Sequence, residues 1–274
     1  MPVIIEWRAQ IFREGKIRKM IKFSAADLAF AFGRLNFRRM EECSTIIRWL
    51  DARPEVRIRD IGCGDGAYDN LIARKGARVA GIDIHEKRLA AARRWFPGDR
   101  TSFHYMDASR LEFPDASFDK AMSLCVMEHL ADDVLVMRNV ARVLKPGGTF
   151  VFSADSLSNP GITAEERARH KKKYAVNNFY TVESVREKLA AAGFDMVESR
   201  YILSTRRDLG FIRLSWKIDR LPEFLGILKL PAYAVLGAAR KLASLPSAGR
   251  KRRSSPEGGL TLLVKAVKRR APAK

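Results

Sequence analysis

Residues 60–66 read Asp-Ile-Gly-Cys-Gly-Asp-Gly, and they follow a run of residues that favour a β-strand, 56–61. The next residues, 67–75, have the pattern of a helix. A glycine-rich loop between a strand and a helix lets the backbone approach a nucleotide closely. Alternating glycines also begin the dinucleotide-binding fingerprint, so the loop alone does not identify the ligand.

Two acidic residues favour S-adenosylmethionine over a dinucleotide. Asp83 ends the second expected strand, where its carboxylate can accept hydrogen bonds from the ribose hydroxyls of a nucleoside. Asp60 lies at the start of the glycine loop. An anion there repels a pyrophosphate but suits a cofactor with an amino group and a sulfonium. The sequence therefore predicts S-adenosylmethionine as the cofactor.

Outward from this loop, short β-rich runs alternate with amphipathic helical patterns. This alternation predicts an α/β fold: a Rossmann-like, doubly wound seven-stranded sheet with helices on both faces and inserted lid segments. The strands are expected at 56–61, 78–83, 101–106, 118–125, 149–154, 195–203 and 260–267, and the helices at 36–51, 67–75, 86–96, 131–144 and 181–193.

The same pattern divides the chain into segments. Residues 1–55 are expected to form a helical lid or edge segment, and residues 56–203 the cofactor-binding core. Residues 204–259 contain four prolines and are expected to be a less regular insertion with amphipathic character. Residues 260–268 should return to the sheet as its last strand, followed by a basic tail at 269–274.

Charge and cysteine content narrow the functional classes. Lys and Arg outnumber Asp and Glu by 11 to 7 in residues 1–55, by 15 to 14 in 56–160 and by 25 to 10 in 161–274. The C-terminal excess indicates either an anionic partner or a solvated basic face. Three cysteines without CxxC spacing predict neither a disulfide framework nor a metal site, which fits the cytoplasm. We expect no secretory signal and no membrane span.

The order and spacing of five segments resemble class I S-adenosylmethionine-dependent methyltransferases of the small-molecule type, those with a methyltransferase domain 11. The segments are 60–66, 81–83, 106–108, 111–119 and 143–148. The resemblance implies that Asp83 binds the ribose, that Asp107 contacts the adenine amino group and that the backbone of Gly62 and Gly64 lines the methionine moiety. Cys63, Ile84 and Ala108 complete the implied cofactor site. A turn-capping role for Asp107 is the alternative.

The methyl acceptor is expected at the carboxyl ends of the strands. His129 follows the fourth strand, where it could act as a general base or orient the loop through a backbone hydrogen bond. The expected substrate contacts are Tyr68, His170, Tyr174 and Tyr180. For Tyr68, ordinary packing is an equal alternative. For the insertion that holds His170 and Tyr174, the alternative is a solvated basic helix.

These observations predict methyl transfer to a small or lipid-like molecule. The alternatives are an RNA methyltransferase, suggested by the basic C-terminal part with its aromatics, and a non-catalytic cofactor-binding or scaffolding protein. The apolar stretch 224–245 and the basic run 250–253 predict peripheral contact with an anionic membrane at its inner face, although a buried lid has the same composition. Nucleic acid is the less favoured partner, and the sequence determines neither the acceptor atom nor the oligomeric state.

Overall fold

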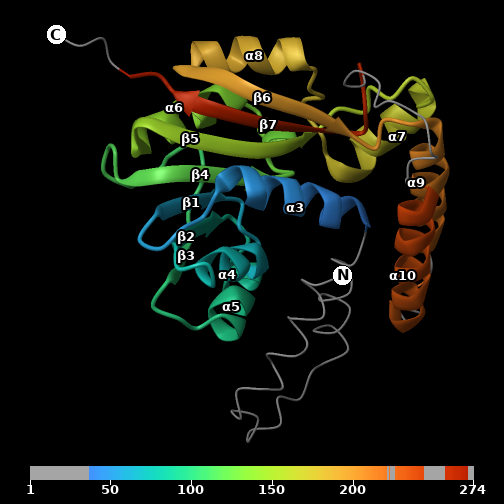
Figure 1. Ribbon diagram of the computed structural model, residues 1–274, viewed down its shortest axis with the longest axis horizontal. Helices are drawn as coiled ribbons and strands as arrows, with labels where there is room; N and C mark the ends of the chain where they lie inside the picture. The colour runs from blue at the N-terminus through green and yellow to red at the C-terminus, as the bar shows by residue number, and fades with distance from the viewer. Residues whose placement is uncertain (1–36, 221, 223–225, 244–256, 271–274) are drawn as a thin grey trace, which may run out of the picture.

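The computed structural model describes residues 37–220, 222, 226–243 and 257–270. Within these ranges seven strands form one sheet in the order β3-β2-β1-β4-β5-β7-β6 (Figure 1). The strands are β1 (Arg57–Ile61), β2 (Arg78–Asp83), β3 (Thr101–Tyr105), β4 (Phe118–Leu124), β5 (Leu144–Asp155), β6 (Phe194–Ile202) and β7 (Thr261–Lys268). Strands β1 to β5 pair in parallel, and β7 is antiparallel to both neighbours. The predicted α/β fold is confirmed.

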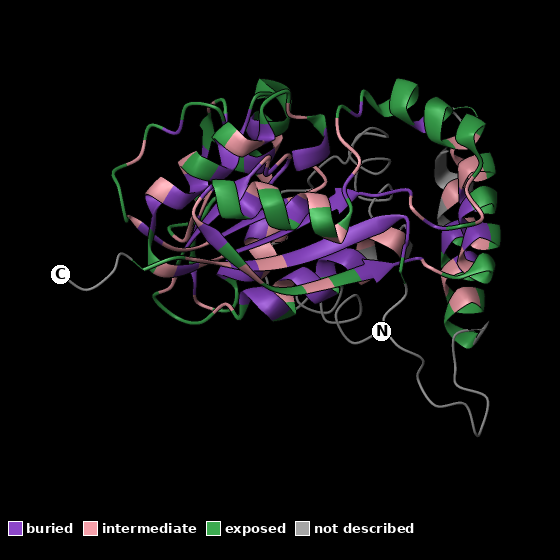
Figure 2. Ribbon diagram, turned by 90° about the horizontal axis from the view of Figure 1, so that it is seen from above, coloured by how far each residue is buried: buried purple, intermediate pink, exposed green. Residues whose placement is uncertain are grey.

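Helices cover both faces of this sheet. They are α3 (Phe37–Leu50), α4 (Ala67–Ala73), α5 (Glu86–Trp95), α6 (Asp133–Val143), α7 (Ala164–Tyr174), α8 (Val182–Ala191), α9 (Arg206–Asp219) and α10 (Gly226–Ala243). Side chains of α6 and α8 join the core on one face, and those of α3 and α4 join the core on the other. Helices α9 and α10 lie at one edge of the molecule (Figures 1 and 2). None of the helices in the described ranges combines the length and hydrophobicity that a membrane crossing requires.

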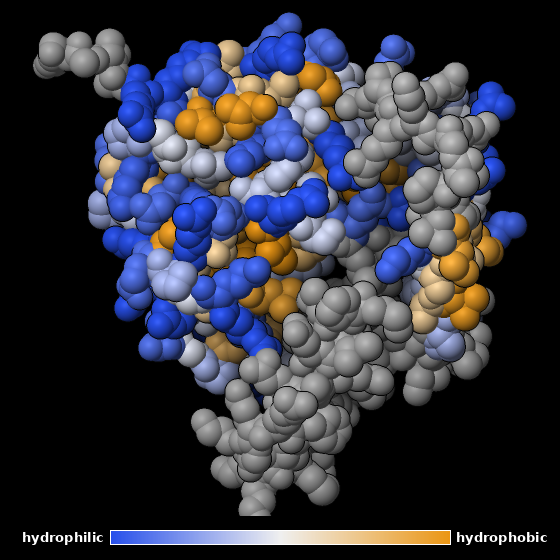
Figure 3. Space-filling view, viewed as in Figure 1, coloured by the Kyte–Doolittle hydropathy of each residue, from blue (hydrophilic) through white to orange (hydrophobic). Residues whose placement is uncertain are grey.

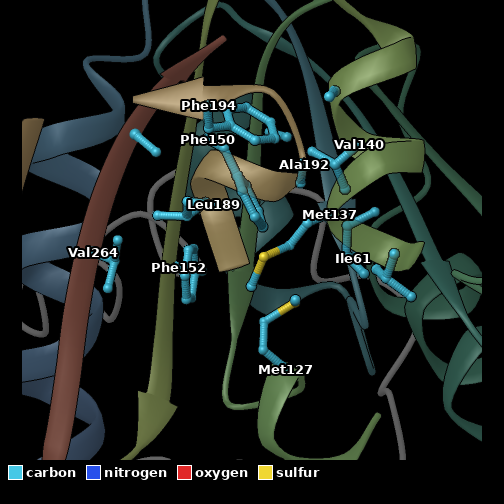
Figure 4. Close-up of a cluster of buried hydrophobic side chains, with 14 of the residues drawn as sticks. Ile61, Met127, Met137, Val140, Phe150, Phe152, Leu189, Ala192, Phe194 and Val264 are labelled. Atoms are coloured by element: carbon cyan, nitrogen blue, oxygen red, sulfur yellow. The ribbon is translucent and has the colours of Figure 1, made fainter. Parts of the chain in front are cut away.

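The central strand β5 is buried on both faces over residues 150–154, and most of these residues are apolar. On β5, Phe150 and Phe152 face α6 and α8, and their rings stack with centroids 4.8 Å apart (Figure 4). Val151, between them, belongs to the core under α3 and α4. This alternation fixes the register of the sheet and therefore the position of the carboxyl ends of β4 and β5.

Two regions differ from the sequence prediction. Strand β5 begins at Leu144 rather than at residue 149, because Leu144 pairs with Phe118 before residues 145–148 bulge out of the ladder. The stretch expected to be less regular contains two helices, α9 and α10. Thr205 caps α9 through a capping box with Asp208. Pro231 lies within α10, beyond its first turn, where it removes one backbone hydrogen bond of the helix.

Candidate functional site

The glycine loop turns over the carboxyl ends of β1 and β2. Gly62 and Gly64 have φ values of 75° and 57°, a region that favours glycine. A Cβ atom on Gly62 would lie 2.3 Å from Cγ2 of Val126, whereas one on Gly64 would meet nothing within 4 Å. The loop is therefore packed against Val126 at Gly62, whereas the space beside Gly64 is open. This geometry fits the close approach of a nucleoside cofactor.

Asp83 holds the loop against the second strand. Its Oδ2 atom accepts a hydrogen bond from the Gly64 amide at 2.9 Å, and its Oδ1 atom accepts one from the His85 amide at 2.8 Å. The next residue, Ile84, is apolar but 57% exposed. The nearly buried carboxylate of Asp83 suits a polar ribose, and the exposed side chain of Ile84 suits packing against a flat, weakly polar base. These residues lie where the sequence predicted.

The segment after β3 holds the other predicted cofactor contacts. One carboxylate oxygen of Asp107 accepts a hydrogen bond from the Ser109 amide at 2.7 Å, which is the turn-capping contact. The Asp107 side chain is also exposed, so capping does not remove it from a ligand. Ala108 is buried and belongs to the core. Cys63 is buried in a cluster with Leu89, Ala92 and Phe103.

Asp60 has a different environment from the one its sequence position suggests. It is buried, and burial together with the neighbouring carboxyl of Asp69 raises the pKa of Asp60 well above its usual range. The sequence argument relied on a negative charge at this position. A cation bound nearby would lower this pKa again, so the charge of Asp60 depends on its ligand.

A cluster of ionisable side chains lies at the carboxyl ends of β4 and β5. Cys125 follows β4, Glu128 lies in the short 3₁₀ helix Met127–His129, and Asp155 ends β5. The Sγ atom and the carboxylate oxygens of these three residues lie within 4.8 Å of one another. Helix α3 contributes Arg38, which donates to Asp155, and Glu42, whose Oε1 atom accepts from Cys125 Sγ at 2.9 Å.

Asp155 is the most strongly paired member of the cluster. Nε2 of His170, from α7, lies 2.6 Å from Oδ2 of Asp155, and both side chains are buried. Burial opposes the ionisation of Asp155, but Arg38 and His170 outweigh burial and hold the pKa of Asp155 well below its usual range. Asp155 is therefore a fixed negative charge at the end of β5.

Glu128 is the least satisfied member of the cluster. The residue is buried, and among the described residues its Oε2 atom has no hydrogen-bond partner. Burial, followed by the negative charge of Asp155, raises the pKa of Glu128 to about 8. The ionised form of a carboxyl group with such a pKa and an unengaged oxygen is a good proton acceptor, and this form predominates above about pH 8. The only signal in the sequence was its position beside His129.

His129 points away from this cluster. Its side chain is exposed, and Nδ1 lies 3.3 Å from the backbone oxygen of Ala175. This contact corresponds to the loop-orienting alternative for His129 and does not place the imidazole beside the other ionisable groups.

The four expected substrate contacts occupy different environments. Tyr180 is a core residue, because its buried hydroxyl donates to Asp133 and to the backbone oxygen of Met127, and this position does not suit a substrate contact. Tyr68 is half-buried and packs beside the core under α3 and α4. His170 belongs to the ionisable cluster. Tyr174 lies against the His170 ring, with centroids 4.6 Å apart.

An aromatic wall adjoins the ionisable cluster. The rings of Phe179 and Trp216 each lie 6.4 Å from the His170 ring, centroid to centroid. With Tyr174, they bring together α7, the segment after it, and α9. The sequence places Tyr174 and Phe179 in one segment and Trp216 in another, so only the fold shows that all three rings lie near His170.

Residues 59–152 match the methyltransferase domain family, Methyltransf_11. The chain is 34% identical over 139 residues to the ubiquinone biosynthesis O-methyltransferase of Rhizobium leguminosarum bv. trifolii, covering 49% of this chain and 52% of the relative. It is 38% identical over 128 residues to the 27-O-demethylrifamycin SV methyltransferase of Amycolatopsis mediterranei, covering 44% and 47%. The chain thus spans about half the length of these curated relatives.

Among solved structures, the fold is similar to phosphoethanolamine N-methyltransferase 2 of Haemonchus contortus in complex with phosphomonomethylethanolamine and S-adenosylhomocysteine. The TM-score is 0.64 at 20% identity, over 92% of this chain and 59% of the other. The predicted resemblance to S-adenosylmethionine-dependent methyltransferases is confirmed.

Proposed function

Because residues 59–152 match the methyltransferase domain family, we propose that the chain transfers a methyl group from S-adenosylmethionine to a hydroxyl oxygen of a small, lipid-like acceptor. The observation that carries this proposal is Glu128: a buried carboxyl group with an unengaged Oε2 atom at the carboxyl end of β4. Both curated relatives described above are named for methylation at oxygen or for an O-demethylated substrate, which supports the choice of atom.

The residues of the glycine loop would bind the cofactor. The open face of Gly64 would accommodate the methionine moiety, Asp83 the ribose hydroxyls, and Ile84 with Asp107 the adenine. S-adenosylmethionine, when bound, supplies a methyl group on a sulfonium whose sulfur leaves as a neutral thioether. The domain then has to align an acceptor in line with this group and exclude water.

Glu128 would remove the acceptor's proton. A hydroxyl oxygen loses its proton when it is alkylated, and Oε2 of Glu128, which is buried and has no hydrogen-bond partner among the described residues, would receive it. Burial, followed by the fixed charge of Asp155, raises the pKa of Glu128 to about 8, so its ionised form is a stronger base than an ordinary carboxylate. Arg38 and His170 hold Asp155 in place for this purpose. The aromatic wall of Tyr174, Phe179 and Trp216 would pack against an apolar acceptor.

The decisive experiment offers methyl-labelled S-adenosylmethionine and separated lipid, polar-metabolite and RNA fractions of a cell extract to the protein. We expect label in the lipid fraction. Glu128→Gln should lower transfer by at least about 100-fold, within the usual range for loss of a general base, without weakening cofactor binding. His129→Ala is the matched control and should retain most activity. Label in RNA would support the alternative acceptor, and cofactor binding without any labelled product would indicate a non-catalytic protein.

A further inference from the structure

Helix α10 presents an apolar surface to solvent. Its buried residues Tyr233 and Leu236 face α9 and α3. On its exposed side lie Pro231, Ala234, Val235, Ala238, Ala239 and Leu242, which recur at helical spacing. Val235 and Leu242 are each 69% exposed. A helix face in contact with water normally carries polar residues, so this face is suited to a different environment.

Helix α9, which packs beside α10, contributes positive charge. Arg206, Lys217 and the following Arg220 are exposed, and Leu214 is 47% exposed among them. The two acids of α9 are both engaged by α10: Asp208 accepts from Nε of Arg240 at 2.8 Å, and Asp219 accepts from the hydroxyl of Tyr233. Both acidic groups of α9 are therefore engaged within the protein, as is Arg240 of α10, whereas Arg206, Lys217 and Arg220 are exposed.

We propose that the outer face of α9 and α10, defined by Arg206, Leu214, Lys217, Val235 and Leu242, binds the surface of an anionic lipid bilayer. Apolar side chains of an interfacial helix enter the boundary between headgroups and acyl chains, and neighbouring cations are attracted to anionic headgroups. Figure 3 shows hydrophobic atoms gathered over α10 at the right-hand edge of the molecule. Residues 224, 225 and 244–253, which contributed to the sequence-based prediction of membrane contact, lie outside the described ranges.

Charge favours a bilayer over a second copy of the chain. A second copy would bring the same outward cations together, in a chain whose formal net charge is +20. Like charges at a contact oppose association, whereas an anionic surface is attracted. RNA would satisfy the cations but would leave Val235 and Leu242 in water. A bilayer satisfies both features.

The position of α9 connects this surface to the proposed acceptor site. Trp216 of α9 is one of the rings beside His170, whereas Lys217 of the same helix is exposed. The two sides of α9 would therefore contact the acceptor and the membrane. This connection rests on the proposed function, but binding to the bilayer does not.

The test is co-sedimentation of the full chain with vesicles of phosphatidylcholine alone or with added phosphatidylglycerol, over a series of salt concentrations. We expect binding to the anionic vesicles that weakens as salt increases. The double variant Val235→Glu/Leu242→Glu should reduce the binding constant at least tenfold. Its control is Val197→Glu, on β6, which also replaces an exposed valine (55% exposed) but lies outside this face. The control should bind like the unmodified chain.

A second pair of variants distinguishes binding through this face from general electrostatic attraction between the basic chain and anionic vesicles. Arg206→Glu/Lys217→Glu should weaken binding and reduce its salt dependence, whereas Lys87→Glu/Arg94→Glu on α5 makes the same charge change elsewhere and should have much less effect. Absence of binding by the full chain, or equal binding by the Val235→Glu/Leu242→Glu variant, would overturn the proposal. Methyl transfer to a soluble acceptor without vesicles is measured separately, so failure of one proposal is distinguishable from failure of the other.

Discussion

The two ends of the candidate site are built in different ways. The cofactor end uses backbone atoms of one continuous loop, held by the Asp83 carboxylate. The acceptor end uses ionisable side chains that come from separate elements; Arg38 and Asp155, for example, are 117 residues apart. The geometry of the cofactor end thus depends mainly on the backbone conformation of the loop. The chemistry of the acceptor end depends on which of its buried side chains are ionised.

This difference predicts which property each substitution changes. Substitutions at the cofactor end should change the dissociation constant for S-adenosylmethionine with little effect on pH dependence. Substitutions at the acceptor end should change folding stability, turnover and their dependence on pH, because buried charges there compensate one another.

The largest effect is expected for Asp155→Asn. This change removes the buried carboxylate that Arg38 and His170 contact, and breaking a buried ion pair typically costs about 3–5 kcal/mol in the free energy of unfolding. Denaturant unfolding measures it. Asp51→Asn is the control, because Asp51 pairs with Arg53 on the surface, and such pairs contribute about 1 kcal/mol or less. Equal effects of the two variants would contradict a charge-compensated acceptor end.

Asp83→Ala should weaken binding of S-adenosylmethionine by about 1.5–3 kcal/mol, the contribution of a hydrogen bond to a charged group. Isothermal calorimetry gives the dissociation constant directly. Because Asp83 also accepts from the Gly64 amide, a thermal unfolding curve must show that the variant is folded. Asp99→Ala, at an exposed position beyond α5, should leave the dissociation constant unchanged. A folded Asp83→Ala variant with unchanged affinity would remove Asp83 from the cofactor site.

The sequence signals for the cofactor end are local. Glycines 62 and 64, Asp83 and Asp107 lie in short segments whose spacing carries the information, and in the structure Asp83 accepts a hydrogen bond from the Gly64 amide. The acceptor end depends on pairing between distant residues. Nothing near His170 in the sequence indicates Asp155 as its partner, and the sequence favoured His129 over Glu128 because imidazole has the more suitable ordinary pKa. Burial makes Glu128 the better candidate for the base, and whether a residue is buried depends on the fold.

The pH dependence of turnover distinguishes Glu128 from His129. Glu128 must be ionised to accept a proton, so kcat/KM should rise with pH and level off above the pKa of about 8. The charged and titratable groups that interact with Glu128 are Arg38, Arg39 and Glu42 of α3, Asp155 of β5, Cys125 after β4, and Tyr180. Glu128→Gln should lack this rise, whereas His129→Ala should retain it. A rise that disappears in His129→Ala instead would identify the imidazole as the base.

The smallest expected effect concerns Arg59, a buried charge within the half of the molecule that otherwise relies on backbone conformation. Arg59 is buried in β1, with its guanidinium 3.7 Å from the centroid of the Phe113 ring. Nη1 donates to the backbone oxygen of Ala80 at 3.0 Å, but among the described residues Nε has no hydrogen-bond partner. Burial lowers the pKa of Arg59 from 12.5 to about 9. Keeping the Arg59 guanidinium protonated in the folded chain at pH 7 therefore costs free energy.

Arg59→Met should therefore increase the free energy of unfolding at pH 7, by about 1 kcal/mol or more, since apolar replacement of a buried charge is often stabilising. The stabilisation should shrink between pH 9 and pH 12.5, because there the folded wild-type chain loses the proton that its unfolded form still holds. Urea unfolding at pH 7 and pH 10 measures both differences. Arg57→Met, on the same strand but exposed, should change stability by less than about 0.5 kcal/mol at either pH. If Arg59→Met is instead destabilising at pH 7, the contacts of Arg59 with Phe113 and Ala80 outweigh the cost of burying its charge. A buried charge would then be compensated by its neighbours in the cofactor half as well.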